Sequence, residues 1–324
     1  MPLSFLDITV LSPPSDASAN ANLQYNISTA SAEWVSAGGG GPVSGYTSGG
    51  RVPTVAFNTV DKFPFAADDN ASDVGDLTAA RNGAAGQSSS TSGYTSGGRV
   101  PPNVNTIDKF PFASNGNATD VGDLTQSRER VAGQSSSASG YSSGGEAPPF
   151  ANTIDKFPFS ADANATDVGD LTQSRYGLAG QSSSSSGYTS GGYAPPFANT
   201  IDKFPFSSDG NATDVGDLTQ GRYRAAGQSS STSGYSSGGR ANSDSNTIDK
   251  FSFASDANAT DVGDLSQIRR GPTGQSSSTN GYTSGGFTTV AFNTIDKFPF
   301  SSDSNATDVG NLTGARDNPA GQQG

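Results

Sequence analysis

A block of 47 residues recurs six times along the 324-residue chain, and this repeat constrains the fold more than any other feature. The tripeptide Asp-Lys-Phe returns every 47 residues, and Asp-Val-Gly, an Arg and a Gly-Gln pair keep the same interval. Repetition with a period of about 20 to 50 residues is typical of solenoids and propellers, so each unit is one structural building block. The copies of Asp-Lys-Phe begin at Asp61, Asp108, Asp155, Asp202, Asp249 and Asp296.

Each unit predicts four short β-strands. In the copy that begins at Gly133, a run of small residues and a Gly-Tyr stretch ending at Gly144-Gly145 predict the first two strands. Apolar and polar residues alternate over 152–159, which indicates a third strand, and the fourth follows within 166–175. No apolar periodicity of 3.6 residues is present in the unit. Because Pro158 has no amide hydrogen, we expect its strand to be an outer or edge strand, or to be bulged there.

Six units of four strands each predict an all-β fold, a six-bladed β-propeller. The Gly-Gly pair after the second strand, the Tyr four residues before it, the Ile-Asp-Lys-Phe strand and the following Arg resemble kelch repeats over residues 36–324. The chain departs from that pattern by having Asp-Val-Gly where kelch units carry an aromatic residue, and Tyr-Thr-Ser in the second strand. The block Asn-Ala-Thr-Asp-Val-Gly-Asp-Leu-Thr also resembles repeats in virion structural proteins of marine bacteriophages, particularly cyanophages.

The last residues of the chain bear on whether the ring closes. Ala320-Gly321-Gln322 restarts the repeat after Arg316. A first strand supplied from this segment could pair within the N-terminal blade and remove an exposed edge. The alternative is an open superhelical array.

Residues that recur in all six units indicate a role in the blade rather than in one active site. We expect the Asp-Lys pair and the Arg to be charge-assisted partners between strands or neighbouring blades. The residues assigned this structural role, taken from the second and third units, are Asp108, Lys109, Phe110, Asp120, Arg128, Gly144 and Gly145.

A pattern of Asp and Asn residues recurs before the last strand. Asp162, Asn164 and Asp167 have oxygen ligands at a spacing that could hold Ca²⁺, which makes them a metal candidate. Asp and Asn also cap turns with their own side chains, and we favour that interpretation. Asn-Ala-Thr has the form of a glycosylation acceptor, but its recurrence is more simply explained by the same turn.

Two segments of the unit vary, and recognition is expected where the units differ. One follows Gly-Gly and the other follows the repeated Arg; in an antiparallel blade both emerge on the same face. Tyr, Arg and Phe are residue types enriched in recognition surfaces, although neutral variation of exposed loops is the alternative. The binding candidates are Arg51, Arg99, Tyr176, Tyr193, Tyr223, Arg240 and Phe287.

Composition excludes several kinds of chemistry. The chain has no His and no Cys, so it has no Ser-His-Asp triad, no Cys nucleophile, no disulfide and no ordinary zinc site. Its net charge of −12 argues against nucleic-acid binding. No uniquely placed acidic pair stands out for a propeller glycosidase, which needs two carboxylates about 5–9.5 Å apart. We expect no catalytic residue and, calcium aside, no cofactor.

The first 35 residues differ from the repeat and are expected to be a docking segment onto other virion proteins, or else a tail without structure. They contain neither a basic signal-peptide start nor an apolar run long enough to span a membrane. Together these features predict a non-enzymatic protein of the virion surface, in a tail fibre or as a head decoration, that binds a host glycan or protein. The alternatives are an intracellular kelch-type interaction module and, less favoured, a propeller glycosidase.

Overall fold

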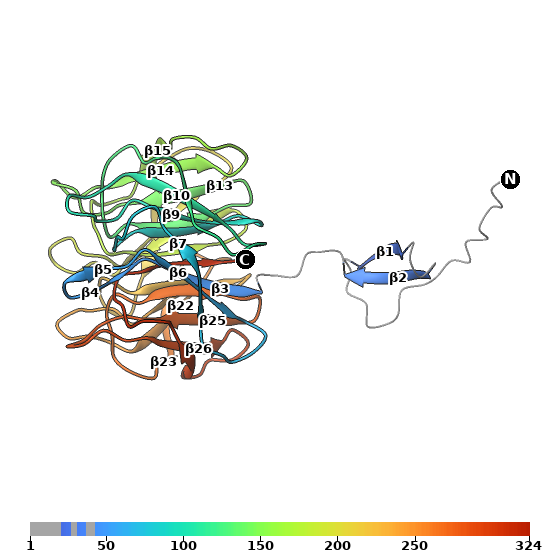
Figure 1. Ribbon diagram of the computed structural model, residues 1–324. Helices are drawn as coiled ribbons and strands as arrows, with labels where there is room; N and C mark the ends of the chain where they lie inside the picture. Colours follow the sequence, from blue (N-terminus) through green and yellow to red (C-terminus); the bar gives the residue numbers. More distant parts are fainter. Residues whose placement is uncertain (1–20, 27–30, 37–42) are drawn as a thin grey trace, which may run out of the picture. The chain divides into compact units, whose positions relative to one another are not determined.

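The computed structural model describes residues 21–26, 31–36 and 43–324 (Figure 1). The chain divides into two compact units, Met1–Gly41 and Pro42–Gly324. In the first unit, β1 (Ala21–Asn26) and β2 (Ser31–Ser36) form an antiparallel pair in which Leu23 lies opposite Trp34 in the register. The other residues of the expected docking segment lie outside the described residues, so its role stays a prediction.

Residues 43–324 form six four-stranded antiparallel sheets arranged as the blades of a propeller, which confirms the predicted fold class (Figure 1). Blade 1 is built from β28 (Ala320–Gln323), β3 (Ser44–Ser48), β6 (Thr59–Pro64) and β7 (Ser72–Asp76). Blade 2 contains β8 (Ala85–Ser88), β9 (Ser92–Ser96), β10 (Thr106–Pro111) and β11 (Thr119–Asp123). Blade 3 contains β12 (Ala132–Ser135), β13 (Ser139–Ser143), β14 (Thr153–Pro158) and β15 (Thr166–Asp170).

The remaining blades repeat this order. Blade 4 contains β16 (Ala179–Ser182), β17 (Ser186–Ser190), β18 (Thr200–Pro205) and β19 (Thr213–Asp217). Blade 5 contains β20 (Ala226–Ser229), β21 (Ser233–Ser237), β22 (Thr247–Ser252) and β23 (Thr260–Asp264). Blade 6 contains β24 (Thr273–Ser276), β25 (Asn280–Ser284), β26 (Thr294–Pro299) and β27 (Thr307–Asn311). A small hairpin, β4 (Arg51–Val52) and β5 (Val55–Ala56), extends the loop after β3.

The ring is closed by the C-terminal strand. β28 pairs with β3, with Gly321 opposite Thr47, and thereby supplies the inner strand of blade 1. Each inner strand also contacts the inner strands of both neighbouring blades, including β28 with β8 and β24. The open array is therefore wrong for this chain.

Close approach at the propeller axis explains the Gly in each inner strand. A Cβ on Gly180 would lie 2.2 Å from the carbonyl oxygen of Gly133 in the preceding blade. Two residues further along each inner strand, serine hydroxyls join neighbouring strands: the Ser135 amide donates a hydrogen bond to Ser182 Oγ at 3.0 Å. At the closure Gln323 replaces serine, and its Oε1 accepts from the Ser276 amide.

Neighbouring blades share an aromatic core. Tyr141 of blade 3 stacks on Phe206 of blade 4 at 4.9 Å between ring centroids, and it contacts Phe204 at 5.5 Å. Both Tyr141 and Phe204 are almost completely buried. Each blade therefore completes its core only against the next blade, as expected for a repeat protein.

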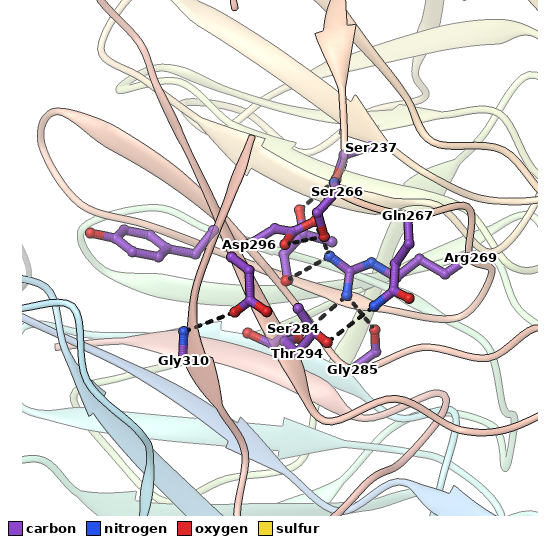
Figure 2. A network of polar contacts seen from close by, with 12 residues as sticks. Ser237, Ser266, Gln267, Arg269, Ser284, Gly285, Thr294, Asp296 and Gly310 are labelled. Atoms are coloured by element: carbon purple, nitrogen blue, oxygen red, sulfur yellow. Dashed lines mark hydrogen bonds and ion pairs between the residues drawn. The ribbon is translucent and has the colours of Figure 1, made fainter. Parts of the chain in front are cut away.

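Buried ion pairs also join the blades. Arg128 lies in the segment that leads from β11 of blade 2 into blade 3. Its guanidinium is 2.9 Å from the carboxylate of Asp155 in β14, and neither side chain is exposed. Asp155 additionally accepts hydrogen bonds from the Thr125 amide and hydroxyl. Figure 2 shows the equivalent network around Arg269 and Asp296. Burial lowers the pKa of these arginines, and attraction to the facing carboxylate offsets part of that shift.

The repeated lysine has a different partner. Lys109 donates to Asp162 of the next blade at 2.9 Å, and this hydrogen bond raises the pKa of Lys109. The expectation of charge-assisted partners between blades is thus confirmed for all six arginines and for five of the six lysines, and the Asp and the Lys of one Asp-Lys pair bond to different residues. Lys62 lacks such a partner within 43–324, because Asn115 occupies the position of the acidic residue.

The expected edge position of the proline strand is wrong. β14 lies between β13 and β15, and Pro158 is its last residue, opposite Ser139. The ladder to β15 has already ended at Lys156, so the missing amide hydrogen interrupts nothing on that side. The bulge lies between Ile154 and Asp155 instead.

Candidate binding face

The two variable segments of each blade pair directly with each other. Tyr176, in the segment entering blade 4, forms an isolated antiparallel bridge with Tyr193, in the loop after β17. The Tyr193 amide donates to the Tyr176 carbonyl at 2.8 Å. We call the face that carries these paired segments the variable face. Its six bridges are Arg51–Asp317, Asn82–Arg99, Glu129–Glu146, Tyr176–Tyr193, Tyr223–Arg240 and Arg270–Phe287.

Five aromatic side chains meet on one arc of the variable face. Tyr176 and Tyr193 lie 5.3 Å apart between ring centroids, and Tyr193 lies 5.9 Å from Tyr223. Phe197 stacks on Tyr223 at 5.4 Å, and Phe150 contacts Tyr176 edge-on at 4.8 Å. We call these five residues the aromatic cluster; they come from blades 3, 4 and 5 and are half-buried.

The sequence predicted three of these five residues. The structure brings Tyr176, Tyr193 and Tyr223 together, whereas Phe287 lies over the guanidinium of Arg270 in blade 6. Phe150 and Phe197 were missed. Both follow a Pro-Pro pair in the loop between the second and third strands, and this shared context was the signal available.

Arginine outside the blade interfaces is confined to the variable face. Of twelve arginines, six form the buried pairs with the repeated Asp. The other six belong to the variable segments, which also contain four carboxylates. These arginines are Arg51, Arg99, Arg130, Arg224, Arg240 and Arg270. On a chain with a net charge of −12, the variable segments thus carry more cations than anions.

Most of these arginines are paired. Arg51 lies 3.4 Å from Asp317, and Arg99 lies 3.2 Å from Glu129. Asp244 forms ion pairs with both Arg240, at 3.8 Å, and Arg270, at 2.8 Å. The predicted residues Arg51, Arg99 and Arg240 are therefore members of ion pairs on the variable face.

A cavity opens at the propeller axis on the variable face. Six backbone segments line it, and its volume is about 110 Å³. The residues at its rim form a closed ring of backbone hydrogen bonds, each amide donating to the preceding carbonyl at 2.5–2.8 Å. Three of these residues are Gly; the other three have left-handed φ of 50–57°. In order around the axial cavity the ring is Gly83, Arg130, Gly177, Arg224, Gly271 and Asn318.

The weak metal candidates lie in the turns of the opposite face. Asp162 bonds to Lys109, and Asn164 Oδ1 accepts the Asp123 amide of the neighbouring blade at 3.0 Å. Asp167 Oδ1 accepts the amide of Gly169. These oxygens thus hold the turn and the blade contact, as the favoured interpretation expected. Within the described part of the chain, no group of three acidic side chains is placed to hold a metal ion.

No protein-family model matches the chain, and no curated protein matches it. The described residues also contain no helix long and apolar enough to cross a membrane. The fold is therefore established by the structure itself, and the kelch and phage resemblances rest on the residues quoted above.

Proposed function

We propose that this protein is a non-enzymatic recognition protein that binds surface glycans through its variable face. The observation that carries the proposal is the aromatic cluster. Six blades share one framework, yet the rings of Phe150, Tyr176, Tyr193, Phe197 and Tyr223 gather on three adjacent blades only. Aromatic rings supply large, rigid contact area and stack on the apolar faces of sugars, and Tyr hydroxyls add hydrogen bonds.

The charges of the face favour binding over hydrolysis. A glycosidase needs one carboxylic acid with a raised pKa and a second free carboxylate nearby. Burial raises the pKa of Asp317, but Arg51 opposes the shift and Asn318 bonds to the same side chain. Glu129, Glu146 and Asp244 each face an arginine. This pattern supports a role for the carboxylates in positioning arginines.

We further propose that the propeller is displayed on a virion surface, as a fibre or a head decoration, with residues 1–35 attached to other virion proteins. The support is the resemblance of the Asn-Ala-Thr-Asp-Val-Gly-Asp-Leu-Thr block to phage repeats. Density-gradient fractionation of cells that express the gene tests this setting. We expect the protein to band with particles; recovery only in a soluble cellular complex would favour an intracellular interaction module instead.

A glycan array tests the binding function. Purified protein is applied to neutral, uronic-acid-containing and sulfated sugars, and bound glycans are followed by calorimetry. Replacing Tyr176, Tyr193 and Tyr223 together by Ala should weaken binding at least 30-fold, because one aromatic anchor typically contributes about 2 kcal/mol. The control replaces Thr91 and Ser184, exposed in turns on the opposite face, by Ala. Loss of binding in the control, or retention in the triple variant, would contradict the proposal.

A further inference from the structure

One arginine of the variable face has no carboxylate partner. Within residues 43–324, which contain all twelve arginines, Arg224 is the one with no carboxylate oxygen within 4.0 Å. It lines the axial cavity and is half-buried, and its Nε has no hydrogen-bond partner, a feature that it shares with six arginines that do have a carboxylate partner. What distinguishes Arg224 is therefore the missing carboxylate: a partly buried cation without a counter-charge is destabilising, so its place at a cavity points to an anionic ligand.

Comparison with the equivalent arginine shows what is missing. Arg130 lines the same cavity and pairs with Glu146, while Glu129 Oε2 lies 3.9 Å from its Nε. In blade 5 the positions of these two acids are occupied by Tyr223 and Arg240. At these two positions, blade 5 therefore has a tyrosine and a second cation where blade 3 has two carboxylates. Burial, with repulsion from Arg130 next, lowers the pKa of Arg224 to about 10.

We propose that the axial cavity binds an anionic group of a sugar, a carboxylate or a sulfate, with Arg224 as its charge partner. This inference rests on the proposed function and names the class of glycan. Arg224 lies over the Tyr223 ring, 5.6 Å from its centroid, and Arg130 lies over Tyr176 at 5.4 Å. The two cations are therefore continuous with the aromatic cluster, and one sugar chain can place a ring on the cluster and its anionic substituent at the cavity.

The repeat itself provides the test variant. Glycine occupies the position of Arg224 in three other blades with the same left-handed backbone, so Arg224→Gly removes the cation without disturbing the ring. Lys62→Gln is the matched control, because Lys62 also lacks a carboxylate partner but lies outside the variable face, over Tyr46. Both variants remove one positive charge.

The experiment measures binding of a uronic-acid oligosaccharide, its carboxyl-reduced form and a sulfated sugar. A charge-assisted hydrogen bond corresponds to about tenfold to hundredfold in affinity, so wild type should prefer an acidic form over the reduced form by that factor. Preference for the uronate or for the sulfated sugar identifies the anion. Arg224→Gly should abolish the preference and Lys62→Gln should retain it. Equal affinity of wild type for all three sugars would overturn the anion site and leave glycan binding intact.

A second readout does not require a glycan. Inorganic sulfate should raise the melting temperature of wild type and of Lys62→Gln more than that of Arg224→Gly, because ligand binding stabilises the folded state. An equal rise in all three proteins reflects general salt stabilisation and would overturn the site. Should no sugar bind while an oligoglutamate peptide binds in an Arg224-dependent way, the sugar assignment is wrong and the proposed function fails with it.

Discussion

Adding one methyl group at the propeller axis should destabilise the whole ring. In Gly180→Ala the new Cβ lies 2.2 Å from the Gly133 carbonyl oxygen and 3.0 Å from its carbon and nitrogen. Relief requires a movement of more than about 1 Å, because ordinary Cβ contacts lie at 3.4–4 Å. The obstacle is backbone in a neighbouring inner strand, which itself contacts the next strand of a closed ring. No flexible side chain can therefore move aside to relieve the clash.

The expected cost follows from this geometry. Overpacking of a well-packed interior costs about 1–3 kcal/mol, and rigid backbone on the receiving side places Gly180→Ala at the upper end. At about 2–4 °C per kcal/mol, the melting temperature should fall by roughly 6 °C or more. Differential scanning calorimetry and near-ultraviolet circular dichroism measure the change.

A second glycine provides the matched control. Gly210 is exposed in a turn, and a Cβ there would meet nothing within 4 Å. Gly210→Ala should leave stability unchanged or raise it by up to about 1 kcal/mol, because alanine restricts the unfolded chain. Equal melting temperatures for the two variants would refute the argument that axial contact requires glycine.

Four other outcomes follow from the structure. Asp155→Asn leaves Arg128 buried without its counter-charge and should cost about 3–5 kcal/mol, whereas Lys109→Gln at the exposed pair should cost less than about 1 kcal/mol; urea titration compares them. Deleting residues 133–179, one whole unit, should give an open ring that aggregates, and a monomer with unchanged melting temperature would contradict closure. Purified protein should hydrolyse no glycan or ester, and activity lost on replacing one acidic residue would overturn the non-enzymatic proposal. Arg224→Gly should raise stability: burial lowers the folded pKa of Arg224 to about 10, below its value in the unfolded chain, so the charged form at pH 7 destabilises the fold; lost packing offsets part of the gain, and calorimetry should show a rise of roughly 2–4 °C.

The repeat period carried most of the fold, because four strands per 47 residues and a restarted first strand define blade number and closure. The partners inside the ring were less accessible. Asp155 and Lys156 are adjacent in sequence but bond to opposite neighbours, Arg128 of the preceding segment and Asp209 of the next blade. Alternation along β14 puts the two side chains on opposite sides, but which neighbour each side meets depends on how the blades are arranged, and the sequence does not report that.

The binding candidates, too, could be predicted from the sequence only in part. Pairing of the variable segments followed from strand alternation, so their common face could be predicted. The importance of Arg224 could not, because it depends on the absence of acids at positions 223 and 240, and only the bridge between those segments brings the positions together. Phe150 and Phe197 were missed for a related reason: the loop after Pro-Pro turns back toward the next blade, and no local periodicity reports that direction.

The closing strand has a consequence for synthesis of the chain. β3 emerges from the ribosome roughly 270 residues before β28, so at about 5–20 residues per second blade 1 lacks its inner strand for some tens of seconds. During that time the ribosome produces five chemically similar segments, four with the sequence Ala-Gly-Gln-Ser and one with Thr-Gly-Gln-Ser. Any of them could pair with β3 in place of β28 and trap a ring with too few blades. The correct segment differs from all of them at its last residue, Gln323, whose longer side chain reaches Ser276 of the sixth blade. The side-chain amide of Gln323 is thus one feature by which a nascent chain can distinguish the closing strand from its five copies.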